Sequence, residues 1–365
     1  MNFGLAKAVA RRWVKAEGGK TPDFCGALYH GSAAWLPDSA VHPPSSDLDV
    51  MVVLDGPGPR EKVGKIRYRD VLLDISYLSS DRIASPDRVL GDYHLAGSFR
   101  GPGIISDPSG RLVQLQAAVA RDYAKRWWVR KRCEHARNHA VSCLNALKES
   151  DPLHDQVTAW LFAAGVTTHL LLTAGLRNPT VRRRYVAVRE LLLDYSRLDS
   201  YETLLKMLGC AQISRDSAEQ HLAALAEASD ATTAVAKTRF PFSADLTAVA
   251  RPIAIDGSRE LIERGDHREA LFWTVATYSR CQKVLYHDAS IEVQERFGRS
   301  YRRTARRSGH FWLCGSPAPQ CRHQGLSSQT LGCGGIHHGG KPGDRRRANE
   351  PSILSAAKAL FSSAG

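Results

Sequence analysis

Two patterns that would mark a secreted, disulfide-stapled protein are missing from this chain of 365 residues. The N-terminal stretch MNFGLAKAVARRWVKAEGG is basic but lacks the continuous apolar run of a secretory signal. It is typical of a short amphipathic helix, with a transit peptide as the less favoured alternative. The first 300 residues contain no Cys-x-x-Cys pair, so we expect reduced thiols and a cytoplasmic location. The cysteines of this part are Cys25, Cys133, Cys143, Cys210 and Cys281.

The first 300 residues also carry little excess charge. The net charge of the whole chain is +13, but residues 301–365 hold eight Arg, two Lys, one Asp and one Glu, which leaves +5 for the rest. Bulk charge therefore gives only a weak argument for nucleic-acid binding. The same tail contains ten of the 29 glycines. We expect residues 299–365 to be a disordered Gly/Arg-rich tail, either native or the product of a reading-frame error.

One stretch lacks formal charge altogether. Val157–Leu176 is twenty uncharged residues, which is the length of a membrane span. Four threonines, two glycines and His169 lower its hydrophobicity. A helix buried in a soluble protein is therefore the favoured interpretation, and we expect no membrane contact.

The remaining sequence divides into two patterns. The first 110 residues alternate short apolar runs with turn signals and predict strands at Ala27–His30, Leu48–Leu54 and Tyr68–Leu78. Long helical periods follow. We therefore predict an α+β protein, with a small mixed sheet and helices in residues 1–115 and an all-α bundle in residues 116–298. The expected helices are Arg121–Glu149, Leu153–Leu176, Val181–Leu198, Tyr201–Leu208, Ser214–Lys237 and His267–His287.

The chemistry is concentrated around the second predicted strand. Asp47 and Asp49 are two residues apart, so their side chains leave the same face of a strand. Two carboxylates on one face suit Mg²⁺. Upstream, Gly31 lets the backbone approach a phosphate, and Ser32 offers a hydroxyl donor. A strand, a Gly-Ser turn and a helix in succession would direct amide donors toward the same anion.

A third carboxylate is expected on a later strand. Asp74 lies within an apolar, β-favouring run, where a charge is costly unless a partner such as a metal compensates it. Asp70 is four residues earlier on the same expected face but nearer the polar start of the strand, and it ranks second.

Together, the Gly-Ser turn, the Asp-x-Asp strand and the later acid resemble the minimal nucleotidyltransferase superfamily. Its antibiotic-modifying members, such as the aminoglycoside nucleotidyltransferases, also append a helical domain. The resemblance covers the first 110 residues or so by motif and the helical region by architecture. It implies that Asp47, Asp49 and Asp74 bind two Mg²⁺ ions and carry out catalysis, and that Gly31 and Ser32 hold a nucleoside triphosphate. One departure is the 14-residue separation of Ser32 from Asp47, a few more than usual, which makes the Pro-rich stretch between them either a surface insertion or a change to the nucleotide entrance.

The resemblance implies transfer of a nucleoside monophosphate, AMP from ATP by default, to a hydroxyl of a small-molecule acceptor, with release of pyrophosphate. Two alternatives stay open: a protein or RNA acceptor, and an inactive fold used for binding. A mildly basic body argues against a strongly cationic acceptor. An acceptor base in the helical region has three candidates, which are Glu134, Glu190 and Glu269. The basic run Arg182–Arg184 is expected to be solvated, with phosphate or RNA contact as the alternative.

Overall fold

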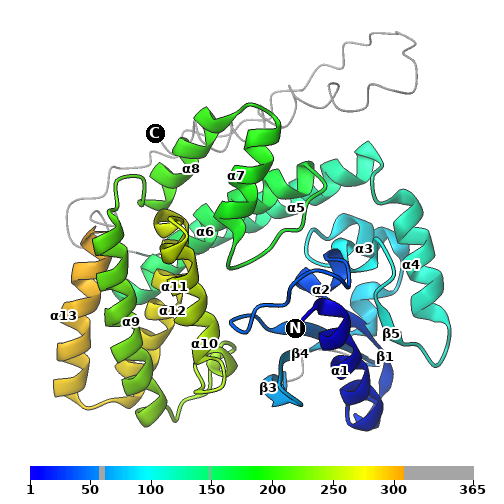
Figure 1. Ribbon diagram of the computed structural model, residues 1–365, viewed down its shortest axis with the longest axis horizontal. Coiled ribbons are helices and arrows are strands. Elements are labelled where there is room, and N and C mark those ends of the chain that lie inside the picture. Colours follow the sequence, from blue (N-terminus) through cyan, green and yellow to red (C-terminus); the bar gives the residue numbers. More distant parts are fainter. Residues whose placement is uncertain (57–61, 147, 149, 308–365) are drawn as a thin grey trace. The chain divides into compact units, whose positions relative to one another are not determined.

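A computed structural model describes residues 1–56, 62–146, 148 and 150–307. It is a mixed α+β protein with a five-stranded sheet near the N-terminus and a long helical region after it (Figure 1). The strands lie in the order β3-β4-β2-β1-β5, with β2 and β4 parallel and the other neighbours antiparallel. Their bounds are β1 Phe24–Tyr29, β2 Leu48–Leu54, β3 Gly64–Tyr68, β4 Val71–Ser79 and β5 Ile104–Ser106.

The two faces of the sheet are covered by different helices. Because side chains alternate along a strand, Val50 and Val52 of β2 pack on one face with α1 (Phe3–Ala16), whose buried residues include Phe3 and Trp13. On the opposite face, buried side chains of the strands pack with the short helices that follow β4. This second core contains Leu28, Val53, Leu78, Val89, Leu90, Phe99 and Leu112. Asp49 and Asp74 have the strand parity of this second face.

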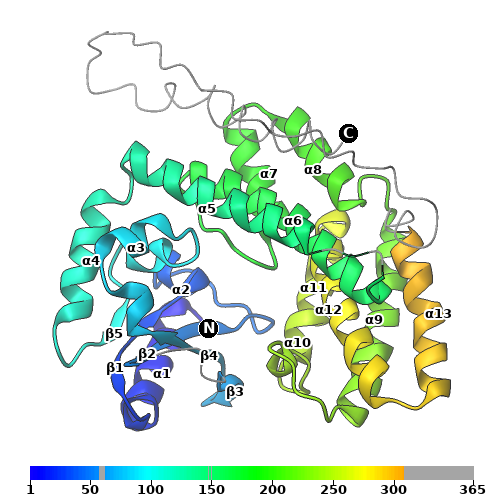
Figure 2. The ribbon, with the colours of Figure 1, turned by 180° about the vertical axis from the view of Figure 1, so that it is seen from behind.

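The helices around the second core are α3 (Pro86–Gly91), η3 (Ala96–Phe99) and α4 (Arg111–Asp122), while α2 (Gly31–Trp35) follows β1 directly. From residue 126 the described chain is entirely helices and connections, with α5 packed along α6 and α12 packed against α6 and α9 (Figure 2). The bounds are α5 Arg126–Asn145, α6 Leu153–Ala174, α7 Arg184–Asp194, α8 Leu198–Leu208, α9 Arg215–Val235, η4 Ser243–Asp245, α10 Arg251–Ala254, α11 Asp256–Glu263, α12 His267–Asp288 and α13 Ile291–Arg307.

The uncharged stretch forms α6. Among the described residues it is the one helix long and apolar enough to cross a membrane by length and composition, and 78% of its most apolar window is buried inside the protein. Burial of this kind is what a core helix of a bundle requires, since its apolar surface is removed from water by neighbouring helices. It agrees with the interpretation of this stretch as a buried core helix.

Three details differ from the sequence-based expectations. The third predicted strand, Tyr68–Leu78, forms β4 only from Val71, because the chain turns at Arg69 and Asp70 with φ of 46° and 62° and Tyr68 ends β3. Asp70 is therefore an exposed turn residue and does not share a strand face with Asp74, so its ranking as a second candidate was wrong. The boundary expected after residue 115 lies within α4, and the sheet and the described helices belong to one compact unit.

The expected tail begins later than residue 299. Helix α13 continues to Arg307, and Tyr301 and Thr304 are buried on it. The hydroxyls of Tyr301 and Ser279 are 2.7 Å apart, which joins α13 to α12. The prediction of disorder for residues 299–307 was wrong because a buried face, rather than composition, decides whether a basic segment folds. The rest of that prediction lies outside the described residues.

Candidate functional site

Three aspartates come together at one end of the sheet. Parallel pairing of β2 with β4 places Asp49 directly beside Asp74, and Asp47 immediately precedes β2. One carboxylate oxygen from each lies within 4.8 Å of the others. Asp47, Asp49 and Asp74, which we call the carboxylate triad, are thus brought together as the sequence predicted. Strands β2 and β4 are neighbours in the sheet, although β3 lies between them in the sequence.

The triad has the character of a cation site. Asp74 is 9% exposed, and its buried Oδ1 has no hydrogen-bond partner among the described residues. Burial and the neighbouring charges of Asp47 and Asp74 raise the pKa of Asp49 well above its usual range. Such a group is costly without a compensating cation. Hard oxygen ligands at this spacing fit Mg²⁺ better than a softer metal.

Gly31 borders the triad, and two features of its position require a residue without a side chain. It has a φ of +52°, and a Cβ atom added there would collide with the carboxylate of Asp49. The backbone N–H of His30 donates to the carbonyl oxygen of Asp49 at 3.1 Å, which fixes the start of α2 beside β2. Ser32 follows in the first turn of α2 and is partly buried. Gly31 therefore lies against Asp49 of the triad, and Ser32 is the residue that follows it in α2.

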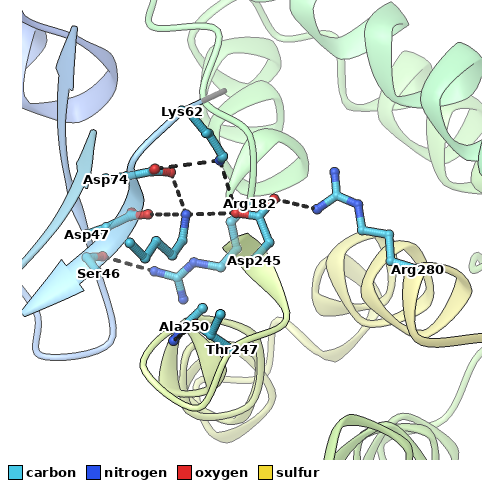
Figure 3. Close-up of polar contacts among 10 residues, drawn as sticks. Ser46, Asp47, Lys62, Asp74, Arg182, Asp245, Thr247, Ala250 and Arg280 are labelled. Carbon is cyan, nitrogen blue, oxygen red and sulfur yellow. Dashed lines mark hydrogen bonds and ion pairs between the residues drawn. The ribbon is translucent and has the colours of Figure 1, made fainter. Parts of the chain in front are cut away.

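Two lysines that the sequence analysis did not single out contact carboxylates of the triad, and Figure 3 labels one of them, Lys62, beside Asp74. The Nζ atom of Lys65 lies 3.0 Å from Asp47 Oδ2 and 2.5 Å from Asp74 Oδ2. Lys65 is directly opposite Asp74 in the β3–β4 ladder, so the two side chains share a face. Lys62 Nζ lies 3.6 Å from Asp74 Oδ1. Burial alone would lower the pKa of Lys65, but Asp47, Asp245 and Asp74 outweigh it, and the net shift is upward.

The helical region contributes a fourth carboxylate. Asp245, at the end of η4, accepts from Lys65 at 3.0 Å and from Arg280 of α12 at 3.1 Å (Figure 3). Lys62 is 3.5 Å away. Burial acts to raise the pKa of Asp245, but Lys65, Arg280 and Lys62 lower it on balance. Asp245 is 180 residues from Lys65 in the chain, and no local motif marks it.

The basic run Arg182–Arg184 is not simply solvated, contrary to expectation. Arg182 Nη2 donates to Ser46 Oγ at 3.0 Å, one residue before the triad (Figure 3). Its guanidinium lies against Gly257 of α11, where a Cβ atom would overlap it. Arg184 is buried and stacks on Phe272 with 3.9 Å between guanidinium and ring centre. Tertiary packing, which a local charge pattern does not encode, decides the role of both residues.

Each of the three glutamates considered as acceptor bases is either bonded to another side chain or exposed. Glu269 is buried and bonded to Arg189 and to the hydroxyl of Tyr201. Glu134 is exposed and pairs with Lys131 at 3.4 Å, and Glu190 is exposed. Among the described residues, Asp245 is the acid of the helical region that contacts the lysines of the triad.

The sequence matches no protein-family model, and no curated protein is significantly similar to it.

Proposed function

We propose that the chain is a metal-dependent nucleotidyltransferase that moves a nucleoside monophosphate from a nucleoside triphosphate, ATP by default, to an acceptor hydroxyl. The observation that carries the proposal is the carboxylate triad, in which the parallel register places Asp74 beside Asp49. Gly31 supports it, because its missing side chain lets the backbone at the start of α2 lie directly against the Asp49 carboxylate. Asp47, Asp49 and Asp74 would hold two Mg²⁺ ions, which supply charge neutralisation at the attacking and leaving oxygens.

In the proposed reaction the acceptor oxygen forms a bond to the α-phosphorus while the bond from that phosphorus to the β-phosphate bridging oxygen breaks. Pyrophosphate leaves with the electron pair of that bond. A carboxylate of the triad would receive the hydroxyl proton. Ser32 donates a hydrogen bond to the triphosphate.

The acceptor is not a polycation in this proposal. Lys62, Lys65, Arg182 and Arg280 lie near the triad or near Asp245 and offset its carboxylates, so the site does not present the acidic surface that would attract a strongly cationic acceptor such as an aminoglycoside. A hydroxyl-bearing small molecule of neutral or negative charge fits better. An RNA acceptor is the second candidate, because Trp127 of α5 is 59% exposed beside Lys131 and the exposed Arg126 and Arg130.

The test is transfer from α-labelled nucleoside triphosphates, with Mg²⁺, to pooled metabolites, antibiotics, RNA and protein. We expect Asp49→Asn to lower transfer by at least about 100-fold. The same variant should raise the melting temperature of the metal-free protein, because the charged form of Asp49 is disfavoured where it lies. The matched control is Asp199→Asn, whose carboxylate is 69% exposed and pairs with Arg197.

Label transfer that persists in Asp49→Asn would contradict the proposal. Transfer by the wild type to RNA alone, with a steep salt dependence, would select the RNA acceptor. Absence of both transfer and Mg²⁺ binding would favour an inactive binding fold.

A further inference from the structure

Lys65 lies where a cation would bind. Its ammonium group is 3.0 Å from Asp47 Oδ2, 2.5 Å from Asp74 Oδ2 and 3.0 Å from Asp245 Oδ1. The ammonium donates hydrogen bonds to Asp74 and Asp245 and forms an ion pair with Asp47, so three carboxylates surround it. Lys62 adds a second ammonium at 3.6 Å from Asp74 Oδ1 and 3.5 Å from Asp245 Oδ1. The two lysines thus supply the positive charge that the clustered carboxylates require.

A divalent cation at the triad cannot leave this arrangement unchanged. Mg²⁺ binds carboxylate oxygens at about 2.0–2.1 Å, and its charge repels an ammonium that contacts the same oxygens. Asp245 does not belong to the triad. When the triad is engaged by metal, Lys65 keeps Asp245 as a partner, but Lys62 and Arg280 contact the same carboxylate. Three cations then share one carboxylate, and a local excess of positive charge results.

We propose that Lys65 and Lys62 form a polyphosphate-binding pair that holds the cation position of the triad until metal binds and then turns to the β- and γ-phosphates of the substrate. This inference rests on the proposed function. Positive groups freed beside a metal site complement a polyanionic triphosphate, and charge-assisted hydrogen bonds to phosphate are the strong ones.

The proposal predicts opposite effects on two ligands. Replacing Lys65 by Met removes the competitor for the triad, so Mn²⁺ alone should bind about tenfold more tightly. The same change removes a phosphate ligand, so tripolyphosphate in saturating Mg²⁺ should bind about tenfold more weakly. A lysine that served only to stabilise the fold would not move the two affinities in opposite directions. Calorimetric titration of the full chain measures both.

The variants are chosen so that a folding defect does not decide the result. Lys65→Met leaves the carboxylates less compensated, so its thermal unfolding is measured first. Lys62→Met is the milder variant, because Lys62 is 27% exposed and Lys65 remains in place. It should change both affinities in the same directions by a smaller factor. Lys283→Met is the control, since Lys283 forms an ion pair with Asp155 at 2.8 Å and contacts none of the triad residues among its described partners.

Equal Mn²⁺ affinity in wild type, Lys65→Met and Lys62→Met would overturn the competition, while leaving the metal site intact. Unchanged tripolyphosphate affinity in both variants would overturn the phosphate role. If folded wild-type protein and both folded variants bind no Mn²⁺, the proposed function fails together with this inference, so the two failures are told apart.

Discussion

At the scale of single residues, Gly31 is constrained both by its backbone conformation and by the neighbouring carboxylate of the triad. Its φ of +52° already disfavours other residues, and the neighbouring Asp49 carboxylate fills the space that a Cβ atom would need. These two constraints are separable, because Gly110 has a φ of +73° with nothing within 4 Å of its Cβ position.

We therefore expect backbone strain to cost about 1–2 kcal/mol in both Gly31→Ala and Gly110→Ala, and Gly31→Ala to lose more stability because it adds a collision with Asp49. Gly31→Ala alone should displace the Asp49 carboxylate and lower nucleotidyl transfer by about 100-fold, the size of effect that a misplaced reacting group produces. Denaturant unfolding and the label-transfer assay measure the two effects. Equal activity of the two variants would refute the role given to Gly31.

The triad could be predicted from sequence because its signals are local. Asp47 and Asp49 have a two-residue spacing before an apolar run, and Asp74 interrupts another apolar run. The partners of the triad have no such signal. Lys65 reaches it through a hairpin and Asp245 through the packing of distant helices. A charge that is placed by tertiary contact leaves no periodic pattern in the chain.

At the scale of elements, a buried arginine ties α5 to the helices that cover the sheet. Arg132 donates to the carbonyl oxygen of Leu90 at 3.1 Å and to that of Tyr123 at 2.7 Å, and it lies over the ring of Tyr123. It is 1% exposed, so the long helix is anchored to the ends of α3 and α4 by one side chain.

Arg132→Ala should lower the free energy of unfolding by about 2–4 kcal/mol, because two buried carbonyls lose their donor and a cavity is left. Arg130→Ala on the same helix is the control, since Arg130 is exposed, and it should change stability by less than about 0.5 kcal/mol. Urea denaturation followed by circular dichroism compares them. A loss shared equally by both variants would mean that helix composition, not the anchor, is responsible.

The Pro-rich connection between Ser32 and Asp47 is fastened to α1. Lys7 Nζ bonds to the carbonyl oxygen of Leu36 at 3.2 Å and to Asp38 at 2.8 Å. The backbone N–H of Phe3 donates to the carbonyl oxygen of Ala40 at 2.9 Å. Of the two expectations for this stretch, a surface insertion and a reshaped entrance, these contacts favour a segment held at the surface against the first helix.

Long apolar patterns gave the elements that could be predicted, and short or polar elements were missed. β2 was predicted as Leu48–Leu54, the range it has, because a buried central strand reads as a continuous apolar run. β3 and β5, at the two edges of the sheet, were not predicted, because β3 alternates polar with apolar residues over only five positions and β5 has only three residues. Their pairing with central strands, rather than their own sequence, makes them strands.

At the scale of the whole molecule, buried histidines couple folding to pH. Burial lowers the pKa of His94 and of His154 from 6.5 to about 4, and lowers that of His169 well below its usual range. The unfolded chain therefore binds more protons than the folded chain between about pH 6.5 and 4. Stability is full above pH 6.5 and falls as the pH drops through this interval.

We expect a loss of a few kcal/mol in all between pH 7 and 4.5, at about 1.4 kcal/mol for each unit of pKa difference. His169→Gln should flatten the slope, because Gln has no proton to bind there, whereas His267→Gln at the partly exposed start of α12 should leave it unchanged. Melting temperatures across this range provide the comparison. A slope that is the same in all three proteins would show that carboxylates, not histidines, set it.

The parallel register of β2 and β4 has a consequence for the order in which the molecule assembles. The turn at Arg69 and Asp70 lets β3 and β4 pair locally, so Lys65 reaches Asp74 as soon as this hairpin closes. Asp49 arrives only through the non-local pairing of β2, which closes a longer loop and is slower. We expect Lys65 to neutralise Asp74 as soon as the hairpin forms. Asp49 then pairs beside a carboxylate whose charge is already balanced, so repulsion between the two acids does not oppose the last step of sheet formation.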